Sequence, residues 1–282
     1  MSALLTDRTI LWLSAAMYLA GFAAGLIALA LRRDTPASRT ILNALLAGGL
    51  ILQISGLYLR GLSVGGCPLG NKFELVQFVV WSAMVLYFVV GTAFRVSLLG
   101  LFTAGYAASL AVISLLVPEW DSPARLKLFG DNPWIELHAA LAVFSYGVFG
   151  LLALTAAMHL LQNWSLKHKR LDGLFWFLPS IVQLDQINFR LLGTGVALLS
   201  ISLAVGASWW LRDTASADPA KITVTVGVWL AYGIALLLRA LGRLVSARLA
   251  WTCVALFAAA LLSLGPVNQS RHGPPASHLR LP

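Results

Sequence analysis

The sequence predicts an all-α protein, a polytopic membrane helix bundle of about eight transmembrane helices with both termini outside. Composition is the first reason, because 59% of the 282 residues are hydrophobic and only 11% are charged, whereas soluble domains carry about 25% charged residues. The second reason is length, because eight apolar segments each approach the length that crosses a bilayer core of about 30 Å. Apolar and polar residues do not alternate within these segments, which excludes a membrane β-barrel.

Each apolar segment is expected to be one helix, because a backbone in lipid must satisfy its hydrogen bonds internally. In chain order the expected spans are Ile10–Leu31, Ile41–Leu59, Phe73–Phe94, Val96–Val117, Trp134–Leu161, Leu191–Leu211, Ile222–Leu238 and Leu249–Val267. The connections after the first and third spans are short, so these spans are expected to form antiparallel hairpins. No connection has room for a soluble domain, so residues 1–282 are expected to form a single transmembrane domain.

Basic residues predict the orientation of the bundle. The connections on one side of the membrane carry eleven Lys and Arg residues and those on the other side carry nine, and the first set abuts helix ends at Arg32-Arg33 and Lys167–Arg170. By the positive-inside rule the first side faces the cytoplasm, so both termini face outward. The long inner connection Gln162–Arg190 contains Leu174–Leu178 (LFWFL), which indicates an amphipathic surface helix that ends at Pro179.

Charged and cysteine residues exclude several function classes. The net charge of +9 is not arranged as a basic stripe interleaved with aromatic residues, so no nucleic-acid partner is expected. Cys67 and Cys253 are too few for a disulfide framework and have no zinc-binding spacing. The sequence places no carboxylate or arginine in the middle of a span, where an ion-coupled transporter would need one. Any chemistry is therefore expected at the outer face, with the lipid bilayer around it.

The segment Asn132–His138 (NPWIELH) opens the longest span and carries the leading candidate site. His138 lies one turn inside the expected helix, with Trp134 one turn before it on the same face. A histidine in an apolar span is a candidate ligand for metal or haem iron, and an interfacial tryptophan beside a structural histidine is the alternative. As a ligand, His138 would need an acceptor for its second ring nitrogen from a backbone carbonyl or another span, because Glu136 lies on a different helical face.

Other residues expected at the outer face complement this histidine. They are His272, His278, Trp209 and Trp210, and the cations Arg60, Lys72, Arg125, Lys127 and Arg212. Two imidazoles, flat aromatic walls and cations for propionates are the parts of a bis-histidine haem site.

Four short motifs follow one another in a specific order. They are Pro68–Glu74 (PLGNKFE) followed by Trp81-Ser82, Pro133–His138 (PWIELH) followed by Ser145-Tyr146, Leu184–Arg190 (LDQINFR) followed by Gly193 and Gly195, and Gly265–Asn268 (GPVN) followed by His272. In order and spacing they resemble the motifs of the cytochrome c assembly family of haem-handling membrane proteins, the group of CcsA, CcmC and HemX-like members.

The resemblance implies a cofactor and its ligands. External histidines ligate haem in that family, so His138 and His272 are the implied axial ligands of the iron, with His278 as the alternative to His272. The implied aromatic contacts are Trp134, Trp209 and Trp210. Haem b is the implied cofactor, and no catalytic residue is assigned.

The segment Trp209–Lys221 departs from the pattern of the family's synthases. It keeps two adjacent tryptophans and Asp218-Pro219 but lacks the WG and WxWD parts of their tryptophan-rich segment. This shortened form resembles the HemX-like branch, so an enzyme that forms thioether bonds is not expected.

Three functions stay open on the sequence. The first is a haem-binding protein of a bacterial cytoplasmic (inner) membrane that presents or passes haem at the outer face, with another cytochrome c assembly or haem-biosynthesis protein as its partner. The second is a HemX-like regulatory or scaffold protein without bound haem, which would dock through Gln162–Arg190. The third, a synthase, would need a partner that supplies the missing tryptophan motif.

Overall fold

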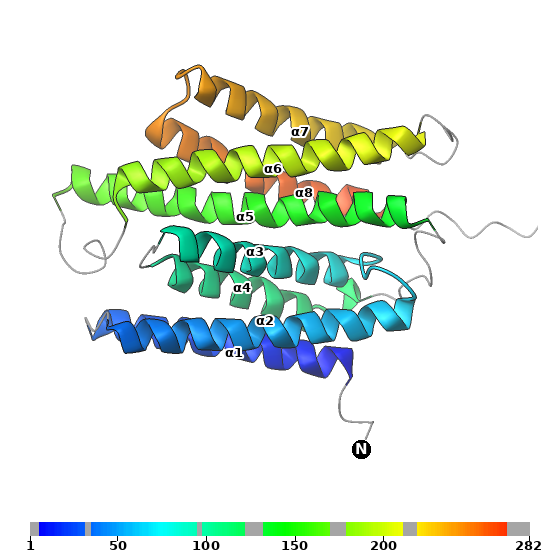
Figure 1. Cartoon of the computed structure of the whole chain (residues 1–282), viewed down its shortest axis with the longest axis horizontal. Coiled ribbons are helices and arrows are strands. Elements are labelled where there is room, and N and C mark those ends of the chain that lie inside the picture. The colour runs from blue at the N-terminus through cyan, green and yellow to red at the C-terminus, as the bar shows by residue number, and fades with distance from the viewer. Residues whose placement is uncertain are drawn as a thin grey trace, which may run out of the picture.

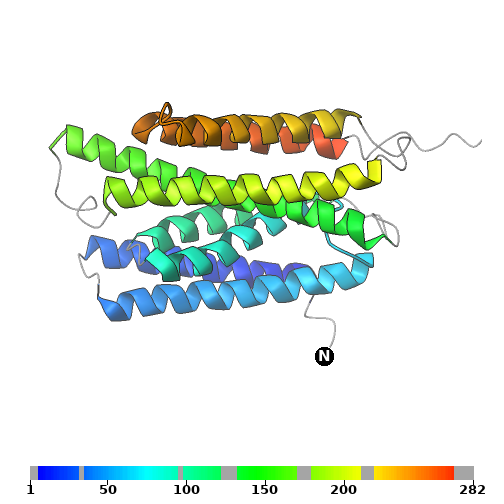
Figure 2. The same cartoon turned by 45° about the horizontal axis from the view of Figure 1, so that its top comes forward.

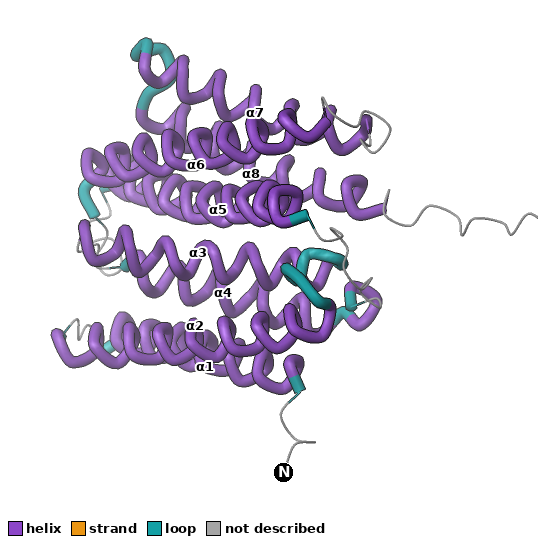
Figure 3. Tube along the Cα trace, turned by 45° about the vertical axis from the view of Figure 1, so that its right-hand side comes forward, coloured by secondary structure: helices purple, strands orange, loops and turns teal. Residues whose placement is uncertain are grey.

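The computed structural model describes residues 6–31, 35–94, 98–121, 132–169, 179–210 and 219–269. These residues form helices without a strand among them (Figure 3). The elements are α1 (Asp7–Ala30), α2 (Pro36–Val64), α3 (Lys72–Phe94), α4 (Leu99–Leu116), the 3-10 helix η1 (Pro118–Trp120), α5 (Pro133–Lys167), α6 (Ile181–Trp210), α7 (Pro219–Ala240) and α8 (Ser246–Gln269). Seven helices in the described ranges are long and apolar enough to cross a membrane, and the apolar part described for α8, Ser246–Leu262, is shorter. The predicted all-α membrane bundle is confirmed.

Several helices extend beyond their apolar segments, because polar residues at their ends find partners. The Thr35 and Ser38 side chains form a reciprocal capping box at the start of α2. Gly65 ends the same helix with a φ of 71°, a conformation that favours glycine. At the start of α6, the Ser180 hydroxyl accepts a hydrogen bond from the Gln183 N–H at 3.2 Å.

The predicted extent of the inner connection Gln162–Arg190 is wrong. α5 continues to Lys167 and α6 begins at Ile181, so both ends of the predicted connection are helical. The predicted surface helix at Leu174–Leu178 lies outside the described residues.

The helices stack in layers (Figure 1). α1 and α2 form one edge, followed by α3 with α4 and then α5; α6 and α8 both pack against α5, and α7 lies at the opposite edge (Figure 1). Figure 2 shows α8 beside α7. α1 contacts α2 and α3 contacts α4, as the predicted hairpins require. In α5, 67% of the residues in an 18-residue apolar stretch are buried, against 11% in the corresponding stretch of α7. The helix that carries His138 is therefore among the most enclosed in the bundle.

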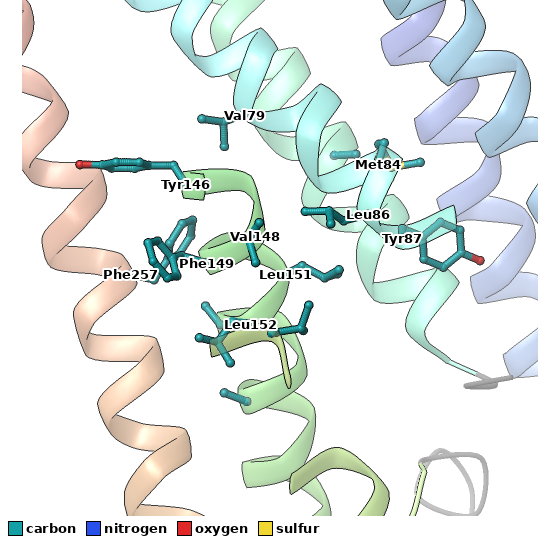
Figure 4. Close-up of a cluster of buried hydrophobic side chains, with 14 of the residues drawn as sticks. Val79, Met84, Leu86, Tyr87, Tyr146, Val148, Phe149, Leu151, Leu152 and Phe257 are labelled. Atoms are coloured by element: carbon teal, nitrogen blue, oxygen red, sulfur yellow. The ribbon is translucent and has the colours of Figure 1, made fainter. Parts of the chain in front are cut away.

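The core lies around α5. Figure 4 shows Val148 and Leu151 between α5 and α3, while Phe149 and Phe257 meet on the side of α8. Val148, Phe149 and Leu151 are fully buried. Because apolar packing covers α5 on both sides, its rotation about its own axis is fixed.

α5 and α6 pack against each other in antiparallel directions along what we call the α5–α6 seam. Its register is set by His138 opposite Ser202 and by the Thr155 hydroxyl, 2.6 Å from the side-chain oxygen of Asn188. We call the end of the bundle with the first turn of α5 the His138 end, and the opposite end the His159 end.

α1 to α4 share a layer of buried polar side chains, which we call the amide layer. The Tyr18 hydroxyl donates to the side-chain oxygen of Gln53 at 2.8 Å, and the Gln53 amide donates to the side-chain oxygen of Gln77 at 3.0 Å. The Gln77 amide donates in turn to the Ser114 hydroxyl at 2.9 Å. All four side chains are buried, so their hydrogen bonds align the four helices within the membrane.

Candidate functional site

His138 is held by two backbone carbonyl contacts in the α5–α6 seam. Its Nδ1 lies 2.7 Å from the carbonyl oxygen of Ser202, and the Ser202 hydroxyl donates to the His138 carbonyl oxygen at 2.8 Å. A carbonyl only accepts, so Nδ1 carries the proton and Nε2 carries the lone pair of the neutral ring. This agrees with the predicted acceptor from another span. Metal-ligating histidines have the same arrangement, in which the second nitrogen donates to an oxygen.

Gly206 makes room for the imidazole of His138. A Cβ at Gly206 would lie 2.7 Å from both Cε1 and Nδ1 of the ring. Ser202 and Gly206 were missed in the sequence, although small residues four apart often mark close packing between membrane helices. The imidazole is thus fixed by a carbonyl and fitted against a backbone surface.

The other predicted site residues are only partly described. Trp134 begins the same helical face as His138 and is 63% exposed at the start of α5. Trp209 and Trp210 end α6, about one turn beyond Gly206, and their side chains lie outside the described part. His272 and His278 also lie outside the described residues. Among the described residues, no cluster of three His, Cys, Asp or Glu side chains could hold a bare metal ion.

An ionic cluster at the same end was not predicted. Arg60 of α2 binds Asp7 of α1 at 2.9 Å, Glu74 of α3 at 2.8 Å, and also Asp121 after η1. Arg8 binds the second oxygen of Asp121 at 2.7 Å. Glu74 is fully buried. The cluster ties three helices and the segment after α4 together, since one guanidinium group binds carboxylates from several directions.

The loop between α2 and α3 is fixed from two sides. Glu74 accepts a hydrogen bond from the Gly70 N–H at 2.6 Å, and the Asn71 side chain accepts one from the Glu74 N–H at 2.8 Å. On the other side, the Cys67 N–H donates to the carboxylate of Glu136. The loop that leads into the PLGNKFE motif therefore contacts the PWIELH motif.

The position of Cys67 in this loop makes its thiol an unusually weak acid. Burial first, and then the charges of Glu136 and Glu74, raise the pKa of its thiol to about 12. At pH 8 only about one thiol in ten thousand is then the reactive thiolate. In a Cys253→Ser background, we expect the iodoacetamide rate of Cys67 to rise about tenfold per pH unit from pH 8 to 11. A rate that levels off near pH 9, as for an ordinary thiol, would contradict this.

A second buried histidine lies at the opposite end of the α5–α6 seam. His159 is fully buried, with Nε2 3.4 Å from the Ser246 hydroxyl. Asp185 interacts electrostatically with it and pairs with Arg239. Within the described residues, His159 Nδ1 and one oxygen of Asp185 have no hydrogen-bond partner. His159 matches no ligand motif in the sequence, and we assign it no role at the site.

Comparison with known proteins supports the resemblance seen in the motifs. Residues 69–268 match a family model described as Cytochrome C assembly protein. HemX of Brevibacillus brevis is 30% identical over 158 residues, which are 56% of this chain and 58% of HemX. The cytochrome c biogenesis protein CcsA of Thermosynechococcus vestitus is 26% identical over 223 residues, covering 64% of this chain and 69% of CcsA.

Part of a larger relative is also similar. NrfI of Wolinella succinogenes is 31% identical over 163 residues, 56% of this chain but only 17% of NrfI. The chain thus spans a little over half of HemX and a small part of NrfI. Because the family model covers most of the sequence, from the loop before α3 into α8, the chain belongs to the cytochrome c assembly protein family.

Proposed function

We propose that the protein binds haem b at the His138 end and presents it or passes it on at the outer face of a bacterial cytoplasmic membrane. His138 supplies one axial ligand, and His272, or alternatively His278, supplies the other. Trp134, Trp209 and Trp210 contact the porphyrin. Another cytochrome c assembly or haem-biosynthesis protein is the proposed partner, and no bond-forming step is assigned to this chain.

The hydrogen bond from His138 Nδ1 to the Ser202 carbonyl oxygen carries the proposal. It fits an axial ligand, because it leaves the lone pair on Nε2 and sets the plane of the ring. Gly206 fits as well, because only a residue without a Cβ leaves the imidazole in this position. A haem needs one or two such nitrogens, whereas a bare ion needs a larger ligand cluster.

Haem would supply the iron and porphyrin that cytochromes use for electron transfer. The residues of this chain would hold and orient it. Ser202 keeps His138 in one tautomer, and the exposed ring of Trp134 offers an apolar surface one turn away. A second ligand from the chain after α8 would let the cofactor be bound and released without unfolding the bundle.

The test is an absorption spectrum of the purified protein in mild detergent, oxidised and reduced, after expression with added haemin. We expect a Soret band with sharp reduced peaks that His138→Ala abolishes. His272→Ala or His278→Ala should shift the peaks, which would identify the second ligand. His168→Ala, which removes an exposed histidine at the His159 end, is the matched control and should change nothing.

Two results would oppose the proposal. Haem retained in full by His138→Ala would remove the proposed ligand. No haem in the wild-type protein would favour the HemX-like regulatory or scaffold role without a cofactor.

A further inference from the structure

The first turn of α5 is held on two sides. His138 faces α6, where Ser202 binds its ring. Glu136, two residues earlier, lies on another face of the helix and accepts a hydrogen bond from the Cys67 N–H. Gly66 packs on the same carboxylate, since a Cβ there would lie 3.2 Å from its Oε1. Rotation of this turn would break one of the two attachments.

The attachment of Glu136 leads back to the ionic cluster. The loop that contains Cys67 is also bound by Glu74, through the Gly70 N–H. Glu74 is held by Arg60, which binds Asp7 as well. A continuous series of charged and backbone hydrogen bonds therefore runs from α1 and α2 through the loop to the first turn of α5.

The residues of this series come from two parts of the sequence, one before the region that matches the family model and one within it. The family match begins at residue 69, after α1 and α2. Asp7, Arg60 and the Cys67 N–H thus lie before the matched region, whereas Glu74 and Glu136 lie within it. The loop that follows α1 and α2 therefore contacts the matched region at Glu136, two residues from His138.

We infer that Glu136 is a positioning residue for His138, and that α1 and α2 act through Arg60 and the following loop to fix the first turn of α5. This inference rests on the proposed function, because it gives the N-terminal helices a role in setting the haem ligand. Groups that orient a metal ligand typically change metal affinity by about 10–100-fold when they are removed.

A measurement without haem tests the connection itself. In the Cys253→Ser background, Glu136→Gln and Asp7→Asn should each raise the iodoacetamide rate of Cys67. The rise should be about tenfold for Glu136→Gln, because this change removes a charge that raises the pKa of the thiol and weakens the hydrogen bond to the Cys67 N–H. The change in rate for the double variant should differ from the product of the two single-variant changes, since both substitutions act through one loop. Asp185→Asn, which removes an ion pair at the His159 end, is the control and should leave the rate unchanged. Rate changes that simply multiply in the double variant would show that Asp7 and Glu136 are not connected through this loop.

The second measurement concerns the ligand. In the haem-loaded protein, Glu136→Gln and Asp7→Asn should both weaken haem affinity, by about tenfold for Glu136→Gln. The two variants should also shift the reduction potential of the haem in the same direction as each other. Asp185→Asn should move neither quantity. If these variants raise the iodoacetamide rate of Cys67 but leave haem affinity and reduction potential unchanged, Glu136 does not position His138. The proposal that the protein binds haem would still stand. If the wild-type protein binds no haem, the proposed function fails, while the Cys67 rates still decide whether the connection exists.

Discussion

Replacing Arg60 with methionine is expected to destabilise the protein by about 3–5 kcal/mol, the usual cost of removing one partner from a buried ion pair. Arg60 is 15% exposed and binds three carboxylates, of which Glu74 is 1% exposed. Methionine keeps most of the side-chain volume but leaves these negative charges facing one another. Unfolding by denaturant in mixed micelles would measure the loss.

The matched control is Arg243→Met, which removes an exposed arginine after α7 and should change stability by less than about 0.5 kcal/mol. Stability should return in part when Asp7→Asn is added to Arg60→Met, because the repulsion then falls. Equal stabilities of Arg60→Met and Arg243→Met would show that water screens the cluster.

Substituting alanine for Gly147 is expected to be the most damaging small change in the core, at about 1–3 kcal/mol for an overpacked site. A Cβ at Gly147 would lie 2.9 Å from the backbone nitrogen of Ala83 and would overlap the Ser82 hydroxyl. The backbone of α3 has to move to accept it, so α3 and α5 must separate. The same denaturant titration would measure the effect.

Gly227→Ala is the control for this substitution. Gly227 lies within α7 with nothing within 4 Å of its would-be Cβ, and alanine is the better helix former. We expect its stability to be unchanged or slightly raised. If Gly147→Ala proved as stable as Gly227→Ala, α3 and α5 would not approach each other as closely as described.

The helices could be predicted from the sequence because lipid permits few alternatives for an apolar chain. The predicted end of α5 and the predicted start of α6 were wrong, because polar residues continue these helices. Asp185 is an example: it resembles a loop residue in the sequence, but Arg239 of α7 pairs with it. Such pairing depends on helices that are distant in sequence.

The candidate site could be predicted in part for a similar reason. His138 and Trp134 share a periodic face, so their proximity follows from helical geometry alone. Ser202 and Glu136 acquire their roles through contacts across helices, with His138 and Cys67 respectively. Arg60 was expected at the outer face as a cation for haem propionates, whereas the structure pairs it with Asp7, Glu74 and Asp121. Nothing in its neighbouring residues indicates Asp7 or Asp121 as partners.

The ionic cluster also constrains the order in which the nascent chain can assemble. Of the three carboxylates that bind Arg60, only Asp7 precedes it in the sequence, so a growing chain holds a single partner for Arg60 when this residue is added. Glu74 follows 14 residues later, and Asp121 follows only after the whole of α3 and α4. All the residues of the cluster are therefore synthesised before Pro133 opens α5, so the amino-terminal half of the protein can complete it without any residue of that helix.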